Sequence, residues 1–531
     1  AITHKEGPLM VLAGPGSGKT LVITYRVKWL IENAGVHPSN ILVITFTRAA
    51  AEEMRKRFFA FDGMENAPVT FGTFHSIFFM ILRYAYRYTA GNIIREDVKR
   101  RYIKEITENM ELEIEDEKEF LSGIINEISY VKGEMMSLSY YHSSNCSDEL
   151  FAQIYEGYER RLREENLIDF DDMLVFCYEL LKERKDILAM WQQKFQYILI
   201  DEFQDINKVQ YEIVRMLAGK GDHLFIVGDD DQSIYHFRGA RPEIMLNFTK
   251  DYPKAETVLL NVNYRCSKNI LRTAMEVIGC NTRRFKKQLD TPNEEGMPVT
   301  CKEFDNPREE YMCVVAALKK RMERGEDLLN TAILLRTNQE SEGLINVLME
   351  YQVPFTMKEQ LPNLFRHWIC RALLAYLEMA AGDRSRKNFL EIMNRPNRYF
   401  SRDAFDTPIV SFDRLKSFYQ DRDWMEERIC DLEADLRAMA PLKPVAAVNY
   451  IRKAIGYDDY LRSYAEFRRM KPEELFETAD KLAESAAEFA TFVEWKEHAA
   501  RYEEELKKQN QEEREETKDR VTLSTMHSAK G

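Results

Sequence analysis

A glycine-rich segment, Gly14–Thr20, limits what this chain can fold into more than any other feature of its sequence. It follows an apolar run, Leu9–Leu12, that predicts a buried strand, and it opens a helical pattern that runs to about Asn33. A strand, a glycine-rich turn and a helix start are the context that a phosphate-binding loop requires. We therefore predict a nucleotide site whose loop comprises Ala13, Gly14, Pro15, Gly16, Ser17, Gly18, Lys19 and Thr20.

Each part of this loop has a chemical reason. Glycines let backbone N–H groups turn towards a phosphate, and the helix N-terminus favours the anion. Lys19 can reach the β- and γ-phosphates of ATP, and the hydroxyl of Thr20 can ligate Mg²⁺. Ala13 stands where the generic pattern has glycine, and because a small residue is kept, we interpret it as a variant. The alternative is a chance glycine-rich turn, which the Gly-Lys-Thr sequence in this context disfavours.

Several short apolar runs are typical of buried parallel strands, and each is followed by polar or glycine residues and a helical pattern. The predicted strands are Leu9–Leu12, Ile41–Phe46, Tyr197–Ile200, Leu224–Val227, Thr257–Leu260, Val299–Phe304, Thr331–Leu335 and Val521–Met526. Between about Arg83 and Lys194, and again from about Gly382 to Arg520, the chain is charged and helix-like. The sequence thus predicts an α/β protein with two cores, each interrupted by a helical insertion. We expect a solvated helix or mobile arm at residues 501–520, which are almost wholly polar.

A pair of acids follows one of these runs directly. Tyr197–Ile200 leads into Asp201 and Glu202, so both carboxylates are expected at the end of a core strand that faces the phosphate loop. Asp201 would hold Mg²⁺, through water, and Glu202 would act as the general base for the attacking water. The alternative is a solvated acidic turn, which is the minority reading in a chain that also has a phosphate loop.

Two later segments carry polar and cationic groups that suit a nucleotide or a nucleic acid. Gln232, after Leu224–Val227, has a neutral amide suited to a γ-phosphate or its water. Near it stand aromatic and cationic residues that could stack on bases, although ordinary packing explains such a cluster more often. These residues are Tyr235, Phe237 and Arg238. Arg265 could reach the γ-phosphate or form a surface salt bridge, and the residues alone leave these two readings even.

The net charge of −13 argues against a nucleic-acid partner when taken alone, but a local basic groove, not the total charge, decides such binding. No apolar run is long enough to span a bilayer. The eight cysteines are scattered without a CxxC pair. A disulfide framework or zinc site is therefore not expected, and the default location is the cytoplasm.

Taken together, the motifs resemble those of the UvrD/Rep/PcrA family of superfamily 1 DNA helicases over essentially the whole chain. The segments that carry the resemblance are AGPGSGKT (Ala13–Thr20), ITFTRAAAEEM (Ile44–Met54), GTFHSIFFMILR (Gly72–Arg83), LIDFDDML (Leu167–Leu174), ILIDEFQD (Ile198–Asp205), GDDDQSIYHFRGA (Gly228–Ala240), LNVNYR (Leu260–Arg265) and VTLSTMHSAKG (Val521–Gly531).

The resemblance implies an enzyme with two RecA-like motor domains that uses ATP and Mg²⁺ to move 3′ to 5′ on single-stranded DNA and to open single-strand/duplex junctions, in repair or replication restart. ATP would lie between the motor domains. The implied division is 1–82 and 195–276 for the first motor domain, with insertion 83–194, and 277–381 and 520–531 for the second, with insertion 382–519. Protein partners are not implied.

The resemblance also assigns roles to single residues. Lys19 and Thr20 would bind phosphate and magnesium, Asp201 and Glu202 would be metal ligand and base, and Gln232 would sense the γ-phosphate. Tyr264 would stack on adenine, and Arg265 would contact the γ-phosphate. The DNA path would be lined by Phe46, Thr73, His75, Tyr235, Phe237 and Arg238. Residues of the motif that couples DNA to nucleotide would be Thr525, His527, Ser528 and Lys530.

The chain departs from the family pattern in three places. Leu21 stands where relatives often have arginine. The upstream glutamine that reads adenine, and the last motif with a second phosphate-contacting arginine, are not among residues 1–531. We therefore expect residues 1–531 alone to hydrolyse ATP poorly, even with single-stranded DNA. Three other readings stay open: the helicase module of a helicase–nuclease, a nucleotide-gated DNA clamp without unwinding and, remotely, a small-molecule kinase.

Overall fold

The computed structural model describes residues 1–110, 117–219, 221, 223–236, 239–337, 340–357, 364–468, 471–512 and 519–530. The chain forms two compact units: residues 1–143 with 147–301, and residues 144–146 with 302–531. Among the described residues, no helix combines the length and the apolar character needed to cross a membrane. The predicted α/β class is confirmed, because each unit contains a parallel sheet flanked by helices.

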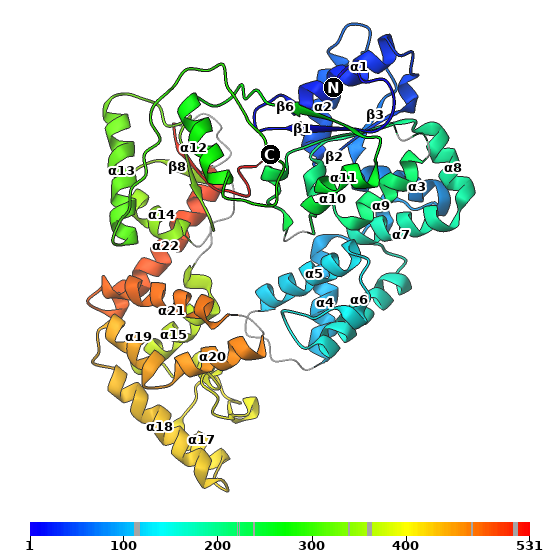
Figure 1. Cartoon of the computed structure of the whole chain (residues 1–531). Coiled ribbons are helices and arrows are strands. Elements are labelled where there is room, and N and C mark those ends of the chain that lie inside the picture. The colour runs from blue at the N-terminus through cyan, green and yellow to red at the C-terminus, as the bar shows by residue number, and fades with distance from the viewer. Residues whose placement is uncertain are drawn as a thin grey trace. The chain divides into compact units, whose positions relative to one another are not determined.

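The first unit is built on a six-stranded parallel sheet with the strand order β3-β2-β4-β5-β1-β6. Figure 1 labels β1, β2, β3 and β6 of this sheet. Its strands are β1 (Leu9–Ala13), β2 (Ile41–Thr45), β3 (Thr70–Thr73), β4 (Tyr197–Ile200), β5 (Leu224–Gly228) and β6 (Glu256–Leu260). All except β3 match predicted runs. Because every pairing is parallel, the carboxyl ends of all the strands lie at one edge of the sheet, which is where ligands bind in such folds.

Alternate residues of the four inner strands, β1, β2, β4 and β5, enter different cores. Leu9 and Val11 of β1 pack with helices on one face of the sheet, whereas Met10 and Leu12 pack with helices on the other. The first face is covered by α1 (Lys19–Glu32) and α2 (Arg48–Phe59). The second is covered by α3 (Phe74–Tyr86), α7 (Phe170–Glu183), α8 (Lys185–Lys194), α9 (Lys208–Ala218), α10 (Pro242–Leu246) and α11 (Phe248–Asp251). Burial on both faces explains why these strands are almost continuously apolar.

Helices make up most of the described part of the predicted insertion at residues 83–194. It contains α4 (Glu96–Asn109), α5 (Glu117–Gly133) and α6 (Asp148–Glu164), followed by α7 and α8. A buried ionic cluster joins these helices: Asp169, the N-cap of α7, accepts hydrogen bonds from Lys99, Lys132 and Tyr158 at 3.0–3.1 Å. The unit also contains α12 (Lys268–Ile278) and the short 3₁₀ helices η1 (Pro38–Asn40), η2 (Ala90–Asn92), η3 (Leu138–Tyr140), η4 (Phe203–Asp205) and η5 (Asp230–Gln232).

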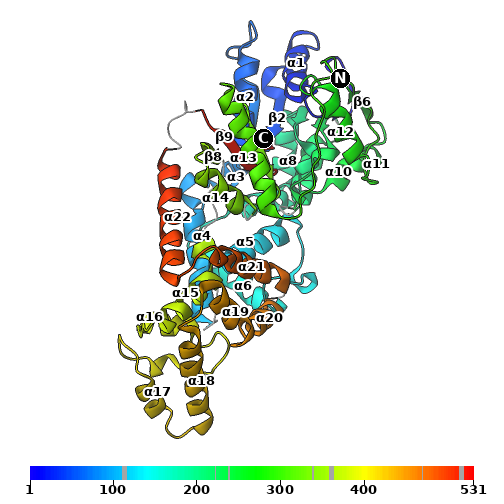
Figure 2. The same ribbon diagram turned by 90° about the vertical axis from the view of Figure 1, so that its left-hand side faces the viewer.

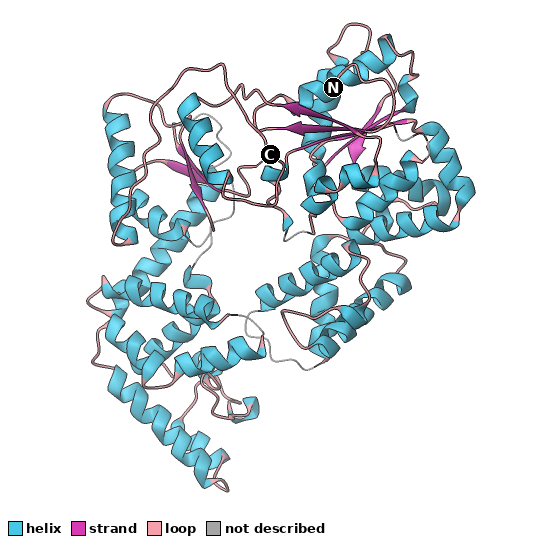
Figure 3. Ribbon diagram, viewed as in Figure 1, coloured by secondary structure: helices cyan, strands magenta, loops and turns pink. Residues whose placement is uncertain are grey.

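The second unit combines a small sheet with a helical bundle (Figure 3). The sheet is parallel, in the order β7-β9-β8, and is formed by β7 (Ala332–Leu335), β8 (Phe355–Met357) and β9 (Val521–Thr525). Helices α13 (Pro307–Glu323) and α14 (Ser341–Glu350) share its core. The predicted strand Val299–Phe304 is wrong: these residues are without regular structure and almost all exposed, because no described strand lies beside them to pair with.

The bundle has its own core, centred on α15. Its helices are α15 (Trp368–Ala380), α16 (Arg386–Ile392), α17 (Phe412–Phe418), α18 (Asp423–Met439), α19 (Pro444–Lys453), α20 (Tyr457–Phe467), α21 (Pro472–Ala487) and α22 (Phe492–Glu512), with 3₁₀ helices η7 (Leu364–Arg366) and η8 (Arg402–Ala404). Helix α22 connects the two cores of this unit (Figure 2). Its Trp495 is buried in the bundle and its Tyr502 against the sheet.

The expected solvated helix or arm at residues 501–520 is helical as far as Glu512, but Tyr502 within it is buried, and residues 513–518 lie outside the described residues. The division between the two compact units falls after Cys301. Before this division, Lys287 forms a buried ion pair with Asp229, and Arg284 forms a partly buried ion pair with Asp231. The predicted domain boundaries stay predictions.

Candidate nucleotide-binding site

The phosphate loop joins β1 to α1 at the carboxyl edge of the sheet. Ala13 is the last, fully buried residue of β1 and pairs with Leu260 of β6. A strand position needs no glycine, which accounts for alanine in place of the first glycine of the generic pattern. Gly16 (φ +66°) and Gly18 (φ +84°) adopt left-handed conformations that favour glycine. The Ser17 hydroxyl donates to the Gly14 carbonyl at 2.7 Å and holds the turn.

The start of α1 is arranged to receive an anion. Gly18 is its N-cap, and no side chain there bonds the first N–H groups of the helix. Such groups, with the helix dipole, form a ready site for phosphate. Lys19 is the first residue of the helix, and its ammonium lies 3.6 Å from the Glu202 carboxylate, across the strand β5 that separates β1 from β4. The structure therefore brings the predicted phosphate loop and the predicted acidic strand end together.

Asp201 and Glu202 follow β4 as the sequence predicts. The N–H of Asp201 donates to the carbonyl of Ile44 at 2.9 Å, which continues the sheet by one residue. Its carboxylate is buried, and the Oδ1 atom has no hydrogen-bond partner among the described residues. Burial, with Glu202 beside it, raises the pKa of Asp201 to about 7. A buried carboxylate oxygen that no described group donates to is chemically suited to a divalent metal, so the residues fit Mg²⁺.

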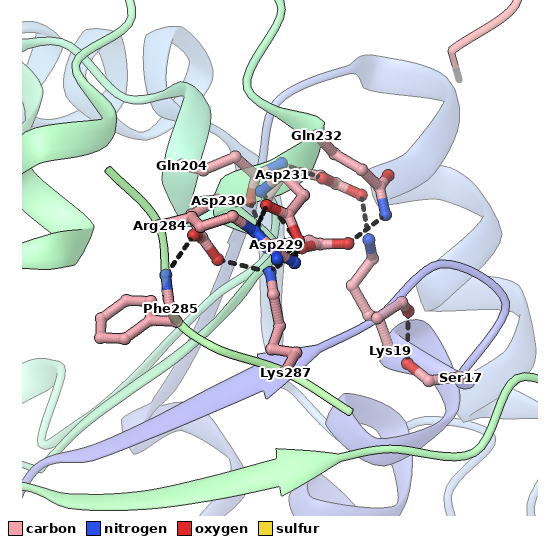
Figure 4. A network of polar contacts seen from close by, with 12 residues as sticks. Ser17, Lys19, Gln204, Asp229, Asp230, Asp231, Gln232, Arg284, Phe285 and Lys287 are labelled. Atoms are coloured by element: carbon pink, nitrogen blue, oxygen red, sulfur yellow. Dashed lines mark hydrogen bonds and ion pairs between the residues drawn. The ribbon is translucent and has the colours of Figure 1, made fainter. Parts of the chain in front are cut away.

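Gln232 ends η5, just after β5, and its position is set by an acidic neighbour. Its amide nitrogen donates to Asp229 Oδ2 at 2.7 Å (Figure 4). Asp229 is fully buried, and its Oδ1 accepts from Lys287 at 2.5 Å. Lys287 also bonds Asp230, and Arg284 donates two hydrogen bonds of 2.6 Å to the third acid, Asp231. Cations thus neutralise most of the charge in this acidic run.

The loop after β6 is bonded to the phosphate loop through Asn263. Its side-chain amide donates to the Pro15 carbonyl at 2.8 Å, and its Oδ1 accepts the N–H groups of Arg265 and Cys266, both at 2.8 Å. The N–H of Tyr264 donates to the Gly16 carbonyl at 3.0 Å. The Tyr264 side chain is 65% exposed, so its ring is available for stacking. The structure therefore places both predicted nucleotide contacts of this loop beside the phosphate loop.

Candidate DNA contacts of the first unit lie beyond the carboxyl ends of its strands. Phe46 follows β2 and stacks on Tyr235, with ring centroids 6.0 Å apart and 9° between the planes. Thr73 caps α3, because its hydroxyl accepts the N–H of Ser76. His75, in the first turn of α3, meets the ring of Phe170 edge-on, and burial lowers its pKa.

For four other predicted DNA residues, the structure gives no position relative to these contacts. Phe237 and Arg238 lie outside the described residues. Thr525 ends β9, and His527 follows it, in the second unit. Ser528 donates its N–H to the Thr525 hydroxyl at 3.3 Å, and Lys530 lies in the same turn region. Gly531 is outside the described residues.

Sequence reasoning did not single out Gln204, Asn263 or Lys287. All three are buried polar side chains that make hydrogen bonds to residues of the site. The available signal was weak, since Gln204 and Asn263 are single polar residues within motif segments and Lys287 lies in none of these segments. The long-range partners of the three residues are separated from them by 25 residues for Gln204, 58 for Lys287 and 248 for Asn263.

The fold and the site are those of a nucleotide-binding α/β protein of the phosphate-loop class, with a loop after β1 and paired acids after β4. The UvrD/REP helicase N-terminal domain family matches residues 1–253, and the UvrD-like helicase C-terminal domain family matches residues 258–531. The chain therefore belongs to the UvrD/Rep helicase family, as its motifs predict.

Individual relatives agree with this assignment. YjcD of Bacillus subtilis (strain 168), provisionally named an ATP-dependent DNA helicase, is 34% identical over 87% of this chain and 62% of its own length. The ATP-dependent DNA helicase PcrA of Staphylococcus aureus (strain Mu50) is 37% identical over 75% of this chain and 55% of its own length. PcrA of Staphylococcus epidermidis gives the same three values. The chain thus spans 55–62% of the length of these relatives.

Proposed function

We propose that the protein is an ATP-dependent DNA helicase that moves 3′ to 5′ along single-stranded DNA and opens single-strand/duplex junctions in the cytoplasm, in DNA repair or replication restart. The observation that carries the proposal is the approach of Lys19 to Glu202 at 3.6 Å, beside the buried Oδ1 of Asp201, which has no hydrogen-bond partner in the part of the chain that the structure describes. A phosphate-binding lysine, a general base and a metal ligand are the groups that hydrolysis of ATP requires.

In this proposal each residue of the site has one role in the binding or hydrolysis of ATP. Lys19 and the N–H groups at the start of α1 bind the β- and γ-phosphates. Glu202 accepts a proton from the attacking water, and Gln232 orients that water or the γ-phosphate. Asp201 and Thr20 would hold Mg²⁺, which when bound draws negative charge away from the phosphate oxygens.

The loop after β6 completes the nucleotide contacts. Tyr264 stacks on adenine, and Arg265 stabilises charge on the γ-phosphate. The hydrogen bonds that Asn263 and Tyr264 donate to the carbonyls of Pro15 and Gly16 support this role, since they fix this loop to the phosphate loop. In the proposal, 1–82 and 195–276 form the first motor domain around insertion 83–194.

DNA is the proposed track for two reasons. The relatives reported above are named ATP-dependent DNA helicases. The stacked rings of Phe46 and Tyr235 lie after the carboxyl ends of β2 and β5, and aromatic faces are what unpaired bases stack on. We place Thr73, His75, Phe237 and Arg238 on the same path, with Thr525 and His527 in the second motor domain, formed by 277–381 and 520–531 around insertion 382–519.

The test uses the full-length natural protein with ATP, Mg²⁺ and defined DNAs. We expect single-stranded DNA to stimulate hydrolysis and a duplex with a 3′ tail to be unwound faster than one with a 5′ tail. Faster unwinding from the 5′ tail would contradict the direction. ATP-dependent binding of DNA without strand displacement would replace the helicase by a nucleotide-gated clamp.

Glu202→Gln separates the chemistry from binding, because glutamine keeps the shape of glutamate but cannot accept the proton. We expect hydrolysis to fall by about 100-fold or more while affinity for ATP is kept. Glu212→Gln, a surface acid of α9 in the same unit, is the control and should hydrolyse ATP normally. Wild-type turnover in Glu202→Gln would refute the assigned base.

A further inference from the structure

Gln204 is a fully buried amide that has no role in the mechanism above. It lies in η4, two residues after Glu202, and its Nε2 donates to the Glu202 carboxylate at 2.5 Å. The same nitrogen is 3.4 Å from Asp205 Oδ2. Its Oε1 accepts the backbone N–H of Asp229 at 2.9 Å. One side chain therefore bonds the residue proposed as the base and Asp229, the first residue after β5. Figure 4 shows Gln204 beside Asp229.

The contact with Asp229 extends to the proposed γ-phosphate sensor. Asp229 accepts the Gln232 amide through its Oδ2 at 2.7 Å, so hydrogen bonds run from Glu202 through Gln204 and Asp229 to Gln232. The sequence accommodates this close approach with Gly228, where a Cβ atom would lie 2.6 Å from Gln204 Oε1. The Gln204 side chain lies so close to the backbone of Gly228 that no methyl group fits between them, and this contact fixes the position of η4 relative to the end of β5.

Glu202 depends on such a contact more than most glutamates would. Its backbone is in the left-handed region at φ +49°, a conformation that residues with a Cβ rarely adopt. Among the described residues, its carboxylate contacts the side chain of Lys19 through Oε1 and that of Gln204 through Oε2. In the proposed mechanism Lys19 binds the phosphates, which leaves Gln204 as the contact that holds the Glu202 carboxylate.

We propose that Gln204 is a positioning residue that aims the Glu202 carboxylate and aligns it with Gln232. This inference rests on the proposed ATP hydrolysis. Only an amide of this length satisfies both neighbours, because it donates to a carboxylate at one end and accepts an N–H at the other. Glutamate lacks the donor, and methionine lacks both groups.

The experiment compares Gln204→Met and Gln204→Glu with the wild-type full-length protein. We measure kcat and KM for DNA-stimulated hydrolysis, the Kd of a fluorescent ATP analogue, and thermal unfolding. Misplacing a catalytic group by about 1 Å can cost about 100-fold, so we expect kcat of both variants to fall roughly 10- to 100-fold. KM and Kd should stay within about threefold, because the phosphate contacts of Lys19 are unchanged.

Gln210→Met is the matched control. Gln210 is also a buried glutamine, but it caps α9 by accepting the N–H of Asn207 and does not contact Glu202. If Gln204 only supports the fold, both methionine variants will lose stability and activity alike, which would overturn the proposal. If it positions Glu202, kcat will fall in Gln204→Met alone.

A double variant gives a second, independent readout. Adding Gln204→Met to Glu202→Gln should reduce kcat little further, because a residue that acts through Glu202 has no effect once the base is gone. Multiplicative losses would overturn the inference. A wild-type protein that does not hydrolyse ATP would instead overturn the proposed function, and unchanged kcat in Gln204→Met beside an active wild type would overturn the positioning role alone.

Discussion

Lys287→Met should destabilise the first unit by about 3–5 kcal/mol, the cost of leaving a buried charge without its partner. The ammonium lies 2.5 Å from both Asp229 and Asp230 and 2.9 Å from Asp231. The side chains of Lys287, Asp229 and Asp230 are at most 2% exposed, so water cannot replace the lost cation. Asp231 keeps Arg284, so the loss falls on the other two carboxylates.

The charge on Lys287 is present throughout the neutral range. Burial opposes that charge, but the surrounding carboxylates outweigh it, and the pKa of Lys287 is raised. A raised lysine pKa contributes stability that is fully present below the unfolded value of about 10.4 and is lost only as pH rises through the folded pKa. The effect of Lys287→Met should therefore be the same at pH 6.5 and pH 8.

The assay is urea-dependent hydrogen exchange of peptides from β5 and η5, because a protein with two units need not unfold in one step. Lys286→Met is the control. The Lys286 side chain is next to Lys287 in the sequence but exposed, so this substitution should change the free energy of unfolding by less than about 0.5 kcal/mol. A difference of under about 1 kcal/mol between the two variants would refute the reasoning that Lys287 compensates buried charge.

Three further predictions test other parts of the structure. Gly16→Ala should abolish tight ATP binding, measured by titration, because the new Cβ would lie 2.8 Å from the Cβ of Arg265. Gly7→Ala is the control: Gly7 also has a positive φ, +83°, but open space around it, so this variant should lose only about 1–2 kcal/mol of folding stability to backbone strain. Because burial lowers the pKa of His75, protonation of its ring opposes folding, and the free energy of unfolding should fall as pH drops below about 6.5. In urea melts, His75→Gln should therefore show a smaller difference in stability between pH 7.5 and pH 5.5 than the wild type. Trp495→Ala should cost the second unit about 3–5 kcal/mol in urea melts, and the exposed Val493→Ala under about 0.5 kcal/mol, whereas equal effects would refute the assigned core.

The sequence predicts the strands of a parallel sheet well because such strands are buried on both faces. Runs such as Tyr197–Ile200 are apolar at every position apart from the tyrosine, and this pattern needs no knowledge of the neighbours. The edge strands β3 and β8 escape prediction, because Thr-Phe-Gly-Thr and Phe-Thr-Met are short and partly polar. Val299–Phe304 fails for the opposite reason: its composition suits a strand, but strand formation needs a partner.

Within the candidate site, residues defined by local spacing are predictable and residues defined by distant contacts are not. Lys19, Asp201 and Glu202 belong to motifs in which strand, turn and residue type coincide. Asn263 acts on Pro15 from 248 residues away, and Lys287 acts on Asp229 from 58 residues away. No periodicity or composition signals such a pairing, since it depends on which strands the sheet places side by side.

Two acidic sites at the carboxyl edge of the six-stranded sheet, one after β5 and one after β4, differ in whether cations of the chain already bind their carboxylates. Asp229, Asp230 and Asp231 have the closeness of a metal site, but Lys287 and Arg284 already bind their carboxylates. A cation entering there would have to displace a buried ammonium, at a cost of several kcal/mol.

Asp201 is the reverse case, with one buried carboxylate oxygen that no described group donates to and a pKa raised to about 7 by burial and the adjacent Glu202. A divalent cation gains most where a buried carboxylate lacks compensation, because binding there removes the desolvation penalty of the charge. We therefore expect Mg²⁺ to bind at the end of β4 and not at the acidic run after β5. Asp201→Asn should weaken Mg²⁺-dependent ATP binding, whereas Asp230→Asn should leave it unchanged. If Asp230→Asn weakens this binding and Asp201→Asn does not, the metal binds after β5 and our assignment to Asp201 is wrong.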